Sequence, residues 1–378
     1  MGVHCVSTPG RQAHKNSCQS NAMKINIKKA LRYFLLVILL AALFLAYRIH
    51  SRINPKPTIA ESSTSIIGFN HIGLVVKDLE SMLTFYQNAT QYELIERMNV
   101  SQNEAADQLF GQTGVSFETA VLKGPNMLLE LTQFDNSSDT MLRKMPPQGP
   151  GMTHTCYQSA SAVPGYDKFK DAGVDMLSRG DTPIELGNYG VSYAYAYDPE
   201  GNMLELEQMS DFVIGLTIGK SWAKKHRLWM TQVAILSPDI SKLIDFYEMV
   251  LGIAPYRVGR YGDNPAFAEV ADLDSLAFHG AWFMLDGRGK KLELMQYEPP
   301  HATPNTLTTK TPLDPGYTYS LEVLDIQEEY KRLQEAGVRF ISPPQQLGHF
   351  WIVYANDADG NVFSLRQALD PAFSLVNF

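Results

Sequence analysis

The sequence predicts an α+β fold in which four repeated βαβββ modules pair into two curved mixed sheets. Three observations support this fold class. The chain repeats several phrases at a near-constant spacing, which is typical of duplicated modules. The repeated phrases contain strands of alternating apolar residues next to amphipathic helices. The length of 378 residues suits about two domains of roughly 150 residues each.

The first two repeated phrases contain predicted strands, and the first of them also contains the start of a helix. The segment "HIGLVVKDLESMLTFYQ" (71–87) matches "QVAILSPDISKLIDFYE" (232–248), and both predict a strand followed by a helix that begins after an aspartate. An aspartate at this place is a good N-cap residue. The segment "NMLLELTQF" (126–134) matches "KKLELMQYE" (290–298), and both predict a half-buried strand.

Two further phrases complete the repeat. The strand "GMTHTCYQS" (151–159) matches "GYTYSLEVL" (316–324), and the turn and strand "DPEGNMLELEQ" (198–208) match "DADGNVFSLRQ" (357–367). Four matches in the same order indicate an internal duplication rather than chance similarity. The predicted division of the chain is a leader over 1–29, an apolar helix over 30–47, a linker over 48–65, a first domain over 66–215, a linker over 216–225 and a second domain over 226–372.

The segment "ALRYFLLVILLAALFLAY" (30–47) is predicted to be a membrane helix. It is near the lower limit of the about 17–25 residues that span a bilayer, and Arg32 can extend toward the interface. An uncleaved anchor is the preferred interpretation, and a cleaved signal peptide is the alternative. The balance of basic residues on the two sides predicts a cytoplasmic N-terminus and an extracytoplasmic globular part, periplasmic if the source is bacterial.

The composition excludes several other classes of protein. Charged residues make up 19% of the chain, its formal net charge is -8, and it has no basic block, so nucleic-acid binding is not expected. Cys156 is the single cysteine of the predicted globular part. A disulfide framework and a paired-cysteine zinc site are therefore excluded there.

Four predicted strands each carry one metal-competent residue among apolar neighbours: His71, Glu130, His154 and Glu205. A charged glutamate inside an apolar strand is costly unless it is paired or binds a metal. Two imidazoles and two carboxylates make a charge-balanced set for a divalent ion. The sequence therefore predicts one metal site in the first half of the chain.

The second half has different residues at the repeated positions of these four. The residues aligned there are Gln232, Glu293, Tyr319 and Ser364, of which only the glutamate is unchanged. We therefore expect the second half to retain the scaffold without a metal site.

These phrases resemble the strand and turn motifs of the vicinal oxygen chelate superfamily. That superfamily includes glyoxalase I, methylmalonyl-CoA epimerase, extradiol dioxygenases and the fosfomycin and bleomycin resistance proteins. The resemblance covers residues 66–372 and implies two glyoxalase-like domains in tandem, the second with a degenerate site. It implies that the four residues bind Zn, Ni, Co, Mn or Fe(II), with Glu130 or Glu205 as a catalytic base.

Three functions are compatible with the resemblance. The first is a metal-dependent lyase or isomerase that acts on a small oxygen-chelating substrate. The second is an Fe(II) extradiol dioxygenase, although no histidine precedes Tyr195 where that family's motif has one. The third is a non-catalytic small-molecule binding or resistance protein. Because the modules can pair within one chain, we expect a monomer.

Overall fold

A computed structural model describes residues 27–53, 64–135, 144–285, 290–302 and 310–377. The chain divides into two compact units, Met1–Ile49 and His50–Phe378, which are described separately. Residues 1–26 of the predicted leader lie outside the described residues.

One long helix, α1 (Ile27–Ile53), begins in the first unit and ends just past its boundary. Its segment Leu31–Arg48 has a mean hydropathy of 1.9, and its large apolar side chains are exposed. A membrane anchor and a signal sequence both have these properties. The helix is longer than the predicted span 30–47 at both ends, so the first residues of the predicted linker 48–65 are helical.

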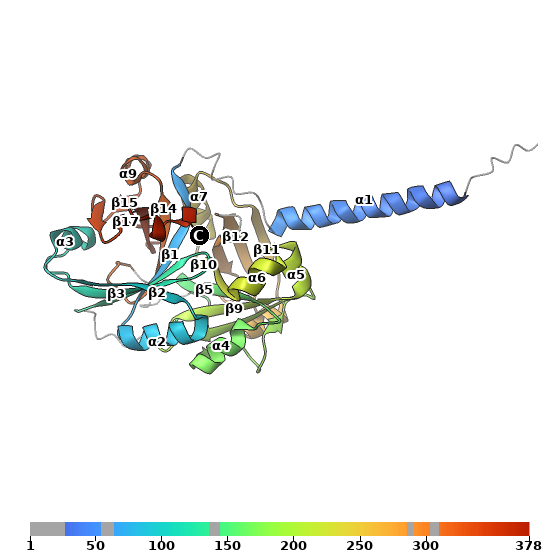
Figure 1. Cartoon of the computed structure of the whole chain (residues 1–378), viewed down its shortest axis with the longest axis horizontal. Coiled ribbons are helices and arrows are strands. Elements are labelled where there is room, and N and C mark those ends of the chain that lie inside the picture. The colour runs from blue at the N-terminus through green and yellow to red at the C-terminus, as the bar shows by residue number, and fades with distance from the viewer. Residues whose placement is uncertain (1–26, 54–63, 136–143, 286–289, 303–309, 378) are drawn as a thin grey trace, which may run out of the picture. The chain divides into compact units, whose positions relative to one another are not determined.

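The second unit contains the four predicted modules (Figure 1). Module 1 comprises β1 (Ile66–Val75), α2 (Leu79–Thr90), β2 (Glu93–Val100), α3 (Glu104–Phe110), β3 (Phe117–Lys123) and β4 (Leu128–Phe134). Module 2 comprises β5 (Gly151–Ala160), α4 (Gly165–Ala172), β6 (Asp175–Met176), β7 (Ile184–Glu185), β8 (Val191–Tyr197) and β9 (Met203–Met209).

The second half of the chain repeats this order. Module 3 comprises β10 (Leu228–Leu236), α7 (Ile240–Leu251), β11 (Arg257–Tyr261), α8 (Pro265–Val270), β12 (Phe278–Met284) and β13 (Lys291–Tyr297). Module 4 comprises β14 (Gly316–Val323), α9 (Ile326–Glu335), β15 (Arg339–Phe340), β16 (Gln345–Leu347), β17 (Phe350–Asn356) and β18 (Val362–Ala368). Two 3-10 turns, η2 (Pro371–Phe373) and η3 (Leu375–Asn377), follow.

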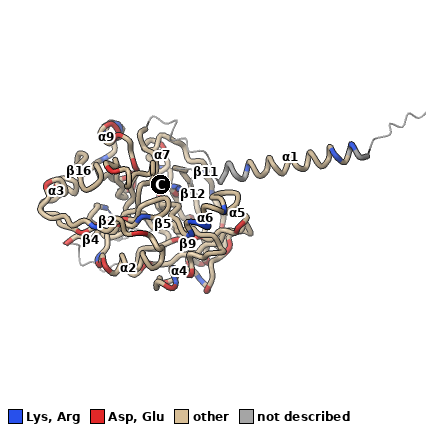
Figure 2. Tube along the Cα trace, viewed as in Figure 1, with Lys and Arg blue, Asp and Glu red and all other residues tan. Residues whose placement is uncertain are grey.

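Two short helices, α5 (Asp211–Leu216) and α6 (Lys220–His226), connect modules 2 and 3. The predicted linker 216–225 is therefore largely helical. Figure 2 shows basic residues near α6, whereas acidic and basic residues are interspersed over much of the second unit in this view.

The four modules form two nine-stranded sheets, but the sheets do not follow the two halves of the sequence. One sheet has the order β15-β17-β18-β14-β1-β4-β3-β2 with β16 beside β17, and the other has the order β11-β12-β13-β10-β5-β9-β8-β6 with β7 beside β8. Modules 1 and 4 therefore share one sheet, and modules 2 and 3 share the other. Antiparallel pairs of β1 with β14 and of β5 with β10 join the modules.

Helices α2, α4, α7 and α9 cover one face of the sheets, whereas α3 and α8 pack in separate apolar clusters. Helices α2 and α4 lie side by side (Figure 1), with the rings of Phe85 and Phe169 6.1 Å apart. Asp78 caps α2, and its repeat equivalent Asp239 caps α7, as the sequence predicts. Because side chains alternate along a strand, the apolar set faces this helical layer and the intervening residues line the opposite face.

The turn before β9 is tied to α2 by a buried hydrogen bond. Asp198 accepts bonds from the Asn202 backbone and from the Tyr86 hydroxyl, both at 2.9 Å. Hydrogen bonds to charged groups contribute about 1.5–3 kcal/mol. We expect Tyr86→Phe to lower the unfolding free energy by about that amount in urea denaturation of the full chain. An unchanged unfolding free energy would mean that the hydrogen bond from the Tyr86 hydroxyl to Asp198 does not stabilise the fold.

Candidate metal centre

The four predicted ligands do not meet in one site, which corrects the sequence-based prediction. His71 and Glu130 lie on β1 and β4 of one sheet, whereas His154 and Glu205 lie on β5 and β9 of the other. The reason is the pairing of modules across the two halves, which places module 3 rather than module 1 beside module 2. Each pair therefore acquires partners from the second half of the chain.

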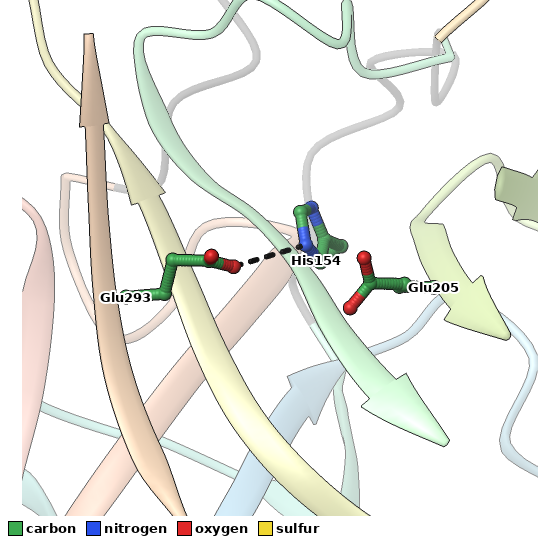
Figure 3. Close-up of side chains that lie close together, drawn as sticks. All are labelled: His154, Glu205 and Glu293. Atoms are coloured by element: carbon green, nitrogen blue, oxygen red, sulfur yellow. Dashed lines mark ion pairs between the residues drawn. The ribbon is translucent and has the colours of Figure 1, made fainter. Parts of the chain in front are cut away.

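The second pair belongs to a cluster that we call the His154 site: His154, Glu205, Gln232 and Glu293. Four adjacent strands, β13, β10, β5 and β9, each supply one residue. The strand registers explain why the residues meet. Glu293 and His154 both lie opposite Ala234, while Gln232 and Glu205 both lie opposite Cys156. Figure 3 shows His154 between the two glutamates.

The distances within the His154 site suit a shared ion. Ligand atoms of His154, Glu205 and Glu293 all lie within 4.8 Å of one another. His154 Nε2 is 4.0 Å from Glu293 Oε2. The Gln232 side-chain amide donates to Glu205 Oε2 at 2.5 Å and to Glu293 Oε2 at 2.8 Å. The amide thus lies between the two carboxylates, and rotation of the amide would present its oxygen instead.

His154 is held in the form that binds metals. Its Nδ1 lies 3.1 Å from Thr153 Oγ1, and its buried Nε2 has no hydrogen-bond partner among the described residues. Burial lowers the pKa of His154 to about 3, so the ring is neutral at physiological pH. A neutral imidazole whose second nitrogen is oriented by a neighbour is the usual metal-binding arrangement.

Among the described residues, no lysine or arginine forms an ion pair with the carboxylates of the His154 site. Burial raises the pKa of Glu205 well above its ordinary value, and the neighbouring Glu293 and Glu207 raise it further. Burial also raises the pKa of Glu293, although the Trp282 indole N–H donates to it at 2.5 Å. Two carboxylates, one imidazole and one amide fit a divalent cation, because the ion would neutralise the two buried charges.

The first pair lies in a different environment, which we call the Arg366 site: His71, Glu130 and Arg366. The Arg366 guanidinium makes a bidentate pair with the Glu130 carboxylate at 2.8 Å for both bonds. His71 Nε2 is 2.9 Å from Ser320 Oγ, and its Nδ1 is 3.0 Å from Asn70 Oδ1. Both ring nitrogens are therefore engaged, and an internal cation neutralises the carboxylate.

The electrostatics of the two sites differ accordingly. Burial alone would raise the pKa of Glu130, but the charges of Arg366 and His71 and the hydrogen bonds from Arg366 together lower it to about 2. The strand register places Arg366 opposite Glu322, as it places Glu207 opposite Gln158 in the other sheet. A glutamate in one sheet thus corresponds to an arginine in the other.

One repeat alignment is also wrong. The sequence pairs His154 with Tyr319, but Ala234 lies opposite His154, whereas its repeat equivalent Gly73 lies opposite Thr318. The register of β5 with β10 shifts at this point, so β5 contains one additional residue. Tyr319 therefore faces the helical side, where its hydroxyl contacts that of Tyr247.

Sequence reasoning missed Gln232 and Glu293 as members of the site. They occupy the repeat positions of His71 and Glu130, so the repeat itself was the available signal. What it did not supply was the pairing of modules, which decides whose residues face His154. The prediction that the second half retains only the scaffold did not anticipate this arrangement, in which each half contributes two residues to the His154 site.

A cavity of about 600 Å³ adjoins the His154 site. Glu205, Gln232 and Glu293 lie in its wall together with aromatic residues. The cavity at the Arg366 site measures only about 40 Å³. Since small-molecule sites are concave pockets of about 300–1,000 Å³, the His154 site has room for a substrate and the Arg366 site has little.

Substitution of Trp282 tests whether its hydrogen bond to Glu293 contributes to metal binding. Its indole N–H donates to Glu293 Oε1 at 2.5 Å and thereby orients the carboxylate. Loss of such a supporting bond typically weakens metal affinity about 10–100-fold. We expect Trp282→Phe to show a decrease of that size in calorimetric titration with Zn²⁺. An unchanged affinity would mean that the indole does not orient this carboxylate for an ion.

The fold defines a class of protein in which strands of two repeated modules pair into one sheet, and in this chain the paired strands of modules 2 and 3 form the His154 site. The family model of the Glyoxalase/Bleomycin resistance protein/Dioxygenase superfamily matches residues 68–206 and 229–365. The chain belongs to this superfamily, as the resemblance implied.

Known proteins are similar to parts or most of the chain. An ethylmalonyl-CoA/methylmalonyl-CoA epimerase from Cereibacter sphaeroides is 28% identical over 142 residues, which are 37% of this chain and 96% of the epimerase. Glyoxalase I from Zea mays is 20% identical with a TM-score of 0.54, covering 82% of this chain and 94% of its own. A putative dioxygenase from Bacillus subtilis is 14% identical with a TM-score of 0.52, covering 82% and 87%. The two structures support the fold alone.

Proposed function

We propose that the protein is a divalent-metal-dependent lyase or isomerase that acts on a small oxygen-chelating substrate at the His154 site. The observation that carries this proposal is the convergence of His154, Glu205 and Glu293 within 4.8 Å beside a large cavity. The imidazole Nε2, the two carboxylates and the Gln232 amide oxygen would hold the ion. When bound, the ion supplies a Lewis acid for vicinal substrate oxygens.

The chain's own groups supply the proton chemistry. Glu205 and Glu293 approach the centre from strands on opposite sides of His154 and both border the cavity. Either carboxylate is therefore placed to accept a proton from a substrate carbon and to return it to a neighbouring carbon or to the same carbon. The aromatic wall, which includes Phe267 and Phe278, gives the cavity an apolar surface beside these carboxylates.

Solvent exchange tests the proposal directly. The full-length protein, loaded with Zn²⁺, Ni²⁺ or Mn²⁺, is incubated in D₂O with a panel of 2-oxo acids, 2-hydroxy acids and acyl thioesters. We expect metal-dependent exchange of the proton next to the chelating oxygens for one chemical class, seen by proton NMR. Glu205→Gln and Glu293→Gln should abolish it. Exchange at the wild-type rate in both variants would exclude these carboxylates as the base.

The Fe(II) extradiol dioxygenase alternative has less support. That chemistry uses two histidines and one carboxylate, and His71, His154 and Glu205 are the predicted ligands that could supply them. The pairing of modules replaces His71 with Gln232 at the centre. Among the described residues, no histidine lines the adjacent cavity. Oxygen consumption with a catechol panel after anaerobic iron loading would revive this alternative.

A non-catalytic binding role is favoured by one observation, the size of the cavity. A volume of about 600 Å³ with aromatic walls is adequate to sequester a small molecule. Such a role predicts that a ligand raises the melting temperature equally in the wild type and in Glu205→Gln. Catalysis predicts that only the wild type converts that ligand.

We also propose that α1 anchors the protein in a membrane, with the globular unit on the extracytoplasmic side. The support is the exposed apolar segment Leu31–Arg48 and the basic residues that precede it. Resistance to carbonate extraction, with protease sensitivity in spheroplasts but not in intact inverted vesicles, is the expected result. Because each sheet is completed within one chain, the proposed oligomeric state is a monomer, testable by light scattering in detergent.

A further inference from the structure

The cavity beside the His154 site has a cationic side that the proposed chemistry does not use. Arg257 on β11 and Lys291 on β13 line it together with Arg260. Arg260 forms an ion pair with Glu298. Within the described part of the chain, no hydrogen bond or ion pair engages Arg257 or Lys291, so their N–H donors are available to a ligand.

The position of Arg257 follows from the strand register. Arg257 lies opposite Trp282, and Trp282 lies opposite Glu293, so the three residues form one row across β11, β12 and β13. The Arg257 guanidinium stacks on the Trp282 ring at 3.7 Å. Neighbouring strands are about 4.8 Å apart, which places the backbone of Arg257 about 10 Å from that of Glu293.

This stacking leaves the guanidinium ready for an anion. The cation–π contact fixes the plane of the guanidinium, and its five N–H donors point outward within that plane. Gly280, which precedes Trp282 on the same face, makes room for the indole, because a Cβ there would come within 2.4 Å of it. The support for the Arg257 orientation is thus built into β12.

Lys291 approaches the same cavity from the neighbouring strand. It is two residues from Glu293 and therefore projects from the same face of β13. Glu207, on the opposite side, lines the cavity as well, but it is already bonded to the Gln158 amide at 2.7 Å. Asp263 is likewise engaged, by the backbone N–H of Leu276 at 2.8 Å.

We infer that Arg257 and Lys291 bind a carboxylate of the substrate, separate from the oxygens that chelate the metal. This inference rests on the proposed function of the His154 site and narrows its substrate to an organic acid. Phe267, Phe278 and Tyr261 line the same cavity and would contact an apolar or aromatic portion of that acid. A guanidinium is well suited to a carboxylate because two of its N–H groups match the two oxygens.

A matched pair of probes tests the carboxylate site. Both 3,4-dihydroxybenzoate and 3,4-dihydroxybenzamide carry vicinal oxygens and an aromatic ring, but only the first carries a negative charge. We expect the Zn²⁺-loaded full-length protein to bind the acid about tenfold more tightly than the amide in calorimetry, since charged hydrogen bonds are roughly twice as strong as neutral ones. Arg257→Gln and Lys291→Met should each reduce that ratio without changing the zinc content or the affinity for the amide.

The control is Arg260→Gln, which removes a cation that is already paired with Glu298 and should leave the ratio unchanged. Equal affinities of the wild type for the two probes, or an equal loss in Arg260→Gln, would overturn the assignment. Failure of the proposed metal function looks different. In that case zinc does not bind, and the affinity for either probe is the same with and without zinc. Tighter binding of the acid than of the amide under those conditions would still support the carboxylate site.

Discussion

Replacing Glu205 or Glu293 with glutamine is expected to weaken Zn²⁺ or Ni²⁺ binding by the full-length protein by at least about 100-fold, judging from the smaller losses seen on removal of supporting residues. The substitution keeps the size of the side chain and removes one of the two charges that would neutralise the ion. Metal content after dialysis against a weak chelator and calorimetric titration both measure this effect. Since these carboxylates and a ring nitrogen of His154 lie within 4.8 Å of one another, the loss should be similar for the two variants.

His71→Gln is the matched control for this prediction. His71 occupies the repeat position of Gln232, so the change makes the Arg366 site more similar to the His154 site at that position. Both nitrogens of His71 already have hydrogen-bond partners, and we expect metal binding to remain within about threefold of the wild type, which is under 1 kcal/mol. Metal loss in His71→Gln, with normal binding in Glu293→Gln, would restore the original four-residue assignment.

The fold could be predicted from the sequence because its information is local and repeated. Alternating residues in "HIGLVV" and the aspartate before α2 specify a strand and a helix start without reference to distant parts of the chain. Repetition then shows that the same unit occurs again. Strand boundaries, caps and the number of modules all follow from such short-range signals, and the structure and the family match confirm the fold class.

The composition of the site could be predicted only in part because it depends on which strands meet. His154 and Glu205 belong to adjacent strands of one module, and their proximity follows from the module itself. Glu293 meets them only through the pairing of β5 with β10. That pairing is between strands far apart in the sequence. Since β1 and β10 are repeats of each other, the local sequence does not indicate which of them pairs with β5. Even the register is altered by one additional residue at Thr153, which no periodicity in the sequence indicates.

Arg366 shows how the two sites diverged in charge, and its removal should have a large effect on stability. The Arg366 side chain is almost completely buried and pairs with Glu130 through two hydrogen bonds of 2.8 Å. Removing one partner of a buried pair leaves an unpaired charge and typically costs about 3–5 kcal/mol. We expect Arg366→Met to lower the unfolding free energy by that amount in urea denaturation, with metal binding at the His154 site retained in the folded fraction.

The pH dependence of stability provides an independent check on this pair. The folded-state pKa of Glu130 is lowered to about 2, whereas an unfolded glutamate titrates near about 4.3. The contribution is therefore fully present above about pH 4.3 and is lost as the pH falls toward 2, with an expected size of about 3 kcal/mol. The double variant Glu130→Leu/Arg366→Met should lack this acid-dependent component and recover most of the stability lost in Arg366→Met, because no buried charge is left unpaired. If the double variant were as unstable as the single one, packing rather than charge would be the function of Arg366.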